Sequence, residues 1–131
     1  MKPFLTLVIL FFQFLPQNGA QADIVDDLMS HFKSGNTKEI AKSFAPSVEL
    51  LIIDQEDVYS KVQSEQILKD FFIKNPPQKT TLIHRLNSNP AFKFGVFSLQ
   101  SKNGSFRVTL TLRAQKANNT FLITELRIEK E

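Results

Sequence analysis

The clearest pattern in the chain is the alternation of apolar and polar residues over 106–113. Successive side chains of a strand point to opposite faces, so this stretch predicts a strand with one buried face and one face in water. A second run, over 121–129, predicts the strand that pairs with it. We therefore expect a C-terminal hairpin whose apolar face is covered by the rest of the chain.

Apolar residues at helical spacing predict three helices in the N-terminal half. The first is expected over 23–34, because aspartates fill its first turn and a Gly-Asn pair follows it. The second is expected to begin at its cap, Thr37, and to extend to Phe44. The third is expected to be capped by Ser60 or Ser64 and to end before a pair of prolines.

Shorter apolar runs predict the other strands of an antiparallel sheet. An acidic turn over 54–57 separates the first two of them, and the second is brief. The four strands are expected over 48–53, 58–61, 80–86 and 92–101, and the alternative for 58–61 is that it only leads into the third helix.

The lengths of the connecting loops predict which residues pair across the sheet. We expect a two-residue turn at Asn103-Gly104, the strongest short hairpin signal in the chain. The last hairpin needs a three-residue loop over 117–119. A four-residue loop over 88–91 is expected to join the strands over 80–86 and 92–101. The resulting pairs are Leu99 with Val108, Leu110 with Leu126, Leu112 with Thr124, and His84 with Gly95.

The N-terminus has the features of a signal peptide. Lys2 provides the positive end, residues 4–15 the apolar run, and Ala20-Gln21-Ala22 the cleavage site. Residues 1–22 are therefore assigned to the signal peptide and residues 23–131 to a single domain. The alternative is an uncleaved anchor, although the run is shorter than the about 20 residues that span a bilayer. We expect an exported protein, periplasmic or secreted, with no stable membrane anchor after cleavage.

Composition excludes several classes of function. The formal charge is +3, with Lys and Arg scattered among acids, whereas nucleic-acid-binding proteins gather them on one face. The absence of cysteine excludes disulfides, thiolate chemistry and cysteine-based zinc sites. His31 and His84 are the only histidines and no metal-ligand spacing accompanies them, so we expect neither metal nor cofactor.

The order of elements resembles the nuclear-transport-factor-2-like superfamily, which includes ketosteroid isomerase and the polyketide-cyclase-like proteins. More closely, the chain is similar to a family of exported Bacteroidota-type domains of unknown function. The stretches that carry this resemblance are 23–27, 33–36, 58–61, 67–72, 103–108 and 126–129. It implies a cone-shaped α+β fold, with three helices packed on a strongly curved antiparallel sheet. It implies no reaction, because the superfamily includes enzymes and non-enzymes alike.

The interior of such a cone is the first place to look for a ligand site. If His84 faces Gly95, its imidazole points into the cone beside space that a ligand could fill. The alternative is that His84 is a hydrogen-bonded core or rim residue, and that Gly95 only makes room for its side chain. In ketosteroid isomerase-like sites a phenol such as Tyr59 stabilises an oxyanion and an acid such as Asp54 or Glu49 abstracts a proton. Those acids can equally be solvated. The candidate pocket residues are Tyr59, His84, Asp54, Phe72, Phe97, Leu110 and Leu126.

The outer face of the sheet is the second candidate site. Alternation predicts that Phe94, Val96, Phe121 and Ile123 share this face with several arginines and glutamates. An apolar patch beside charges is typical of an interface, here with a second copy or another protein. The alternative is that a strand from the chain's own N-terminus covers the patch.

Three functions remain open from the sequence. We expect a non-catalytic domain that binds either a small apolar ligand inside the cone or a protein partner on the sheet. The second is a lyase or isomerase of the ketosteroid isomerase type, and the third is a structural dimer with a filled cone. No catalytic residue is assigned.

Overall fold

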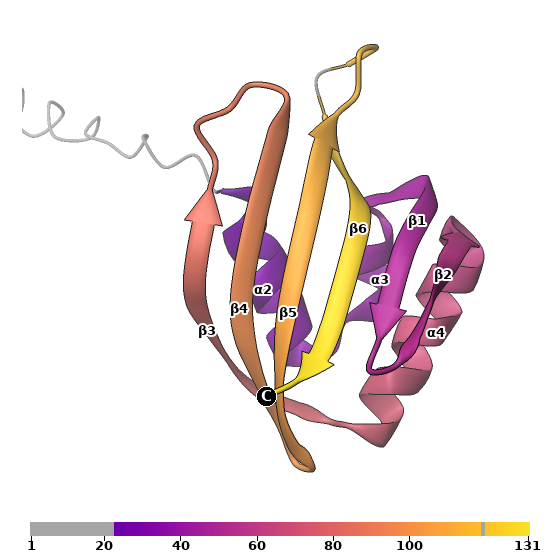
Figure 1. Ribbon diagram of the computed structural model, residues 1–131, viewed down its shortest axis with the longest axis vertical. Coiled ribbons are helices and arrows are strands. Elements are labelled where there is room, and N and C mark those ends of the chain that lie inside the picture. The colour runs from indigo at the N-terminus through magenta and orange to yellow at the C-terminus, as the bar shows by residue number, and fades with distance from the viewer. Residues whose placement is uncertain (1–22, 119) are drawn as a thin grey trace, which may run out of the picture.

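The computed structural model describes residues 23–118 and 120–131. In this part of the chain three helices pack on one face of a curved, open sheet of six strands (Figure 1). The helices are α2 (Ile24–Ser34), α3 (Thr37–Ala41) and α4 (Lys61–Lys74). The strands are β1 (Phe44–Ile52), β2 (Gln55–Ser60), β3 (Pro77–Leu86), β4 (Phe92–Ser101), β5 (Gly104–Ala114) and β6 (Phe121–Lys130).

The strand order across the sheet is β2-β1-β6-β5-β4-β3. All neighbouring strands are antiparallel except β1 and β6, which are parallel. Figure 1 looks onto the outer face of the sheet, with the helices behind it. The predicted α+β class, with three helices on a curved sheet, is confirmed. The predicted signal peptide lies outside the described residues.

Helix α2 begins and ends as its sequence predicts. The Asp23 side chain caps it by accepting a hydrogen bond of 2.8 Å from the backbone N–H of Val25. Gly35 ends it with φ of 66°, the left-handed conformation that glycine adopts at low cost. The buried face of α2, formed by Val25, Leu28 and Phe32, packs toward the sheet.

Helix α3 is shorter than predicted, because tertiary pairing competes with helical spacing. Its cap is Asn36 rather than Thr37, and it ends at Ala41. Phe44 is only 1% exposed and already belongs to β1. The Ile123 N–H donates to the carbonyl oxygen of Ser43 at 2.6 Å, which fixes this segment to β6 before Phe44 could continue the helix.

The hairpin of β1 and β2 also differs from the prediction. The turn consists of Ile53 and Asp54, and the strand that follows starts at Gln55, within the predicted acidic turn. Ile53 has a φ of 61°, and its N–H donates to the carbonyl oxygen of Ile128 at 2.7 Å. Polar residues can pair in an edge strand because both faces of β2 are largely in water, so apolar runs do not reveal such a strand.

Helix α4 starts with a reciprocal cap. The Ser60 hydroxyl accepts from the Gln63 N–H, and the Gln63 side chain accepts from the Ser60 N–H, each at 3.1 Å. Of the two predicted caps, Ser60 is therefore the correct one. Ser64 lies inside the helix, where its hydroxyl is fully buried with no hydrogen-bond partner among the described residues.

The hairpin of β4 and β5 has the predicted faces but not the predicted pairs. Its turn residues are Lys102 and Asn103, so Leu99 lies opposite Phe106 instead of Val108. The Ser101 hydroxyl stabilises this turn by accepting from the Asn103 N–H and donating to the Gly104 carbonyl oxygen. Because the pairing moves by two residues, an even number, every side chain stays on its predicted face.

The last hairpin confirms one predicted pair and contradicts another. Leu110 lies opposite Leu126, as predicted, and Arg107 lies opposite Glu129 in the same register. Beyond Thr111 a bulge shifts the pairing, so Leu112 faces Ile123 and not Thr124. Residue 119 of the predicted loop lies outside the described residues.

Candidate functional site

Phenylalanine rings and leucine side chains fill the space between helices and sheet. Phe32 of α2 contacts Phe72 and Phe97 edge-on, with ring centroids 5.7 and 5.3 Å apart. Phe97, Leu110 and Leu126, three predicted pocket residues, are each 0% exposed and belong to one core cluster with Phe72. Phe72 also borders a surface cavity between α4 and the α2–α3 turn. Phe97, Leu110 and Leu126 therefore form part of the core in this structure.

His84 does not point into the core. A bulge between Leu82 and His84 shifts the pairing of β3, so His84 lies opposite Val96 and not Gly95. His84 therefore shares the outer face with Phe94, whose ring it meets edge-on at 6.3 Å between centroids. The prediction that His84 faces Gly95 is wrong, because no loop length reveals a bulge in the middle of a strand.

Gly95 leaves no free space for a ligand. A Cβ atom at Gly95 would lie 2.7 Å from Cγ1 of Val25, so the absent side chain lets α2 approach the sheet. Arg85, which pairs with Gly95, reaches across this face toward α2.

The remaining catalytic candidates do not converge. Tyr59 is half-buried on β2 and His84 lies on β3, and these are opposite edges of the sheet. Asp54 is exposed in the β1–β2 turn, where it lines a surface cavity of about 300 Å³ together with Phe71 and Lys74. Glu49 is exposed on β1. Tyr59 and His84 therefore do not come together with Asp54 or Glu49 in one site.

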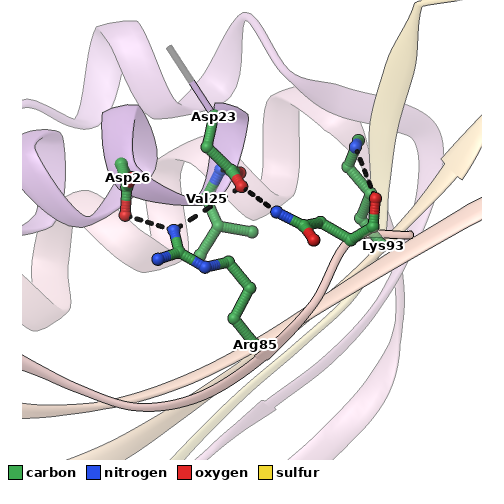
Figure 2. Close-up of polar contacts among 6 residues, drawn as sticks. Asp23, Val25, Asp26, Arg85 and Lys93 are labelled. Atoms are coloured by element: carbon green, nitrogen blue, oxygen red, sulfur yellow. Dashed lines mark hydrogen bonds and ion pairs between the residues drawn. The ribbon is translucent and has the colours of Figure 1, made fainter. Parts of the chain in front are cut away.

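A polar cluster joins the start of α2 to the end of β3 (Figure 2). The Arg85 guanidinium lies 2.5 Å from a carboxylate oxygen of Asp26 and 3.5 Å from one of Asp23. Asn87 donates its side-chain N–H to Asp23 at 2.5 Å. No sequence pattern predicted this cluster, because its two parts are about sixty residues apart along the chain.

The pKa of Asp23 is lowered by this cluster. Partial burial alone would raise it, but the hydrogen bonds from Asn87 and Val25 and the charges of Arg85 and Lys93 together outweigh burial. The folded protein therefore favours the Asp23 carboxylate over its protonated form.

Because the pKa of Asp23 is lowered in the folded protein, we expect the stability of the fold to fall in acid, and Asp23→Asn to reduce this fall. The stabilisation from Asp23 is present above the unfolded pKa of about 4 and is lost as the pH falls through the lower folded pKa. Asp23→Asn should therefore lower the free energy of unfolding at pH 7 and flatten its decline as the pH falls below about 4. Urea unfolding across this range measures both effects. Asp27→Asn, on the same helical turn and exposed, is the control, and equal slopes for the two variants would contradict the prediction.

The outer face of the sheet carries an apolar patch that differs in two residues from the predicted one. Phe94 and Val96 lie on this face, as predicted, and Leu86 pairs with Phe94 there. The bulge at Thr124 turns Ile123 into the core, where it is 0% exposed, and Phe121 also packs against the core. The outer patch therefore consists of Leu86, Phe92, Phe94 and Val96.

Two further features bear on the class of function. Within residues 23–118 and 120–131 no helix is long and apolar enough to cross a membrane. Over the same residues no group of three or more His, Asp or Glu side chains could hold a metal ion.

The three helices on an open, curved sheet define a nuclear-transport-factor-2-like α+β fold. A variant of Rd1NTF2_05 shares it with a TM-score of 0.61 and 15% identity, over 80% of this chain and 92% of that one. The chain belongs to the family described as a domain of unknown function, DUF4783, whose model matches residues 25–129.

Three solved structures of this family that the chain resembles come from Bacteroides species. The chain is similar to the DUF4783 family protein from Bacteroides uniformis, with a TM-score of 0.78 and 25% identity over 83% of this chain and 98% of that one. It is also similar to the one from Bacteroides ovatus, with 0.73 and 26% over 79% and 92% of the two chains. None of the curated proteins compared with the chain matches it.

Proposed function

We propose that this chain is an exported, non-catalytic protein-binding domain that acts through the outer face of its sheet. The observation that carries the proposal is the contrast between the two faces. Phe97, Leu110 and Leu126 on the inner face are each 0% exposed, whereas Phe94 and Val96 on the outer face are half-exposed. Apolar core side chains with no exposure favour a structural role for the inner face, and an accessible apolar patch is suited to a protein partner.

The outer patch has the composition of an interface centre. Phe92, Phe94 and Val96 provide aromatic and β-branched surface, and Leu86 beside them is 39% exposed. Arg113 lies over the Phe92 ring, 5.6 Å from its centroid, at the border of the patch. An apolar centre rimmed by arginine is characteristic of protein interfaces.

A second copy of the chain is the partner that this face fits best. Arg127 lies 3.7 Å from Glu56, Glu125 and Glu129, so one side of the face carries more carboxylates than cations. Arg113, toward the other side, forms no ion pair within the described residues. A two-fold axis presents the same patch on both copies and can bring the cation of each toward the carboxylates of the other.

Sedimentation equilibrium tests the proposed dimer. The wild-type protein should dimerise at micromolar concentrations, and Val96→Glu should weaken the dimer at least about a hundredfold by burying an unpaired charge. Val62→Glu places the same charge on α4, at a side chain that is 75% exposed, and should leave the dimer intact. A wild-type monomer at all concentrations, or equal weakening by both variants, would overturn the proposed partner.

Export is supported by the sequence features of residues 1–22. Lys2, the apolar run and the small residues Ala20 and Ala22 fit the pattern that a signal peptidase recognises. N-terminal sequencing of the protein recovered outside the cytoplasm should then start at Asp23. An intact Met1 on all of the protein would contradict cleavage.

A further inference from the structure

A second surface lies on the helix side of the molecule, away from the outer patch. A cavity of about 610 Å³ opens there between the α2–α3 turn, the end of α4 and the segment that leads into β3. Its volume is in the range of sites that hold small molecules.

The floor and one wall of this cavity are apolar. Phe72, only 7% exposed, lies at its base, and Pro76 and Pro77 line it beside the α2–α3 turn. Gly35 lets Pro77 approach that turn, because a Cβ atom at Gly35 would lie 3.3 Å from the proline ring. Ile73 lines the same cavity and is 67% exposed. Its side chain therefore adds apolar surface to the cavity while contributing little buried area to the stability of the fold.

The charged side chains that line the cavity are mainly basic. Lys38 comes from α3 and Lys69 from α4, and Glu65 is the one acid of the lining. Neither lysine lies within 4.0 Å of a carboxylate in the described part of the chain. Unpaired ammonium groups beside apolar surface favour a ligand that combines a negative charge with an apolar body.

We propose that this cavity binds a small amphiphilic anion, an apolar chain or ring that carries a carboxylate. The apolar body lies against Phe72, Ile73 and the two prolines, and the carboxylate lies between Lys38 and Lys69. This site is on the opposite side of the sheet from the outer patch. Its occupancy is therefore independent of dimerisation, and either proposal can fail without the other.

Titration with sodium decanoate, followed by NMR on protein produced from the full-length chain, tests this site. Decanoate should shift the Ile73 methyl signals and the Lys69 amide signal in a saturable way. Decyltrimethylammonium, with the same chain and the opposite charge, should bind at least about tenfold more weakly. Decyl phosphate tests whether the anion must be a carboxylate, and binding tighter than that of decanoate would overturn the assignment of a carboxylate.

Matched variants on α4 locate the site without unfolding the protein. Ile73→Ser should weaken decanoate binding about tenfold through lost apolar contact, whereas Val62→Ser, 75% exposed on the same helix, should not. Lys69→Gln should weaken it, whereas Lys61→Gln, outside the cavity, should not. Absence of saturable shifts, equal binding of the two decyl ions, or equal behaviour within either pair of variants would overturn the proposal.

Discussion

Replacement of Phe97 by alanine is expected to lower the free energy of unfolding by about 3–5 kcal/mol. Phe97 is 0% exposed, and its ring contacts Phe32 of α2 edge-on at 5.3 Å between centroids. Loss of the ring removes both its burial and this contact, and the packed neighbours cannot fully collapse into the space. A domain of this size has a total stability of about 5–15 kcal/mol, so much of the variant should be unfolded under mild denaturing conditions.

Phe94→Ala is the matched control for this loss. Phe94 lies on the same strand but on the outer face, where it is half-exposed, so its removal should cost clearly less. Urea unfolding at concentrations where the protein is monomeric measures both variants and keeps any dimer contribution out of the comparison. Equal losses for the two variants would show that the inner face is not the packed one.

Replacement of Gly95 by alanine is expected to cost about 1–3 kcal/mol by overpacking. The new Cβ would lie 2.7 Å from Val25 Cγ1 and 3.3 Å from Cγ2, closer than carbon atoms approach without movement. Val25 is β-branched and fully buried, so it cannot turn away at low cost, and α2 would have to move off the sheet.

A double-mutant cycle separates this clash from other effects. Val25→Ala removes both methyl groups that the Gly95→Ala side chain would meet, so the double variant should lose less stability than the sum of the two single losses. An interaction energy of about 1 kcal/mol or more is expected from chemical denaturation. Additive losses would show that α2 does not lie against Gly95.

Alternation of residue types predicted the faces of most strands well, because burial follows a period of two along a strand. Val108, Leu110, Leu126 and Ile128 all lie on the inner face, as alternation requires. The pairing of β4 with β5 was off by two residues and still preserved every face. The alternation of residue types therefore predicts the face on which a side chain lies more reliably than turn rules predict the residue opposite it on the next strand.

Bulges are the features that alternation could not predict. The extra residue at Thr124 reverses the faces beyond it, which moved Ile123 and Phe121 from the predicted interface into the core. A bulge before His84 likewise placed the imidazole on the outer face. Both depend on how the neighbouring strand and the helices pack, and no local sequence signal marks either position.

The candidate site could be predicted only in part. Phe94 and Val96 were found from strand parity, because β4 pairs with β5 without a bulge. Ile73 and Lys69 were not found, because an exposed isoleucine on a helix looks the same from sequence whether or not a cavity lies beside it. Val62 on the same helix shows this, since it is more exposed and lines none of the cavities described above.

One NMR measurement tests most directly whether the domain binds through its surfaces and not through its interior. Methyl spectra of the monomeric and dimeric protein, with and without decanoate, report on the core, the outer patch and the cavity on the helix side together. We expect Val96 signals to change on dimerisation and Ile73 signals to change with decanoate, while Leu110 and Leu126 signals respond to neither. Intermolecular contacts between decanoate and the Leu110 or Leu126 methyl groups would reveal an open interior and contradict this account.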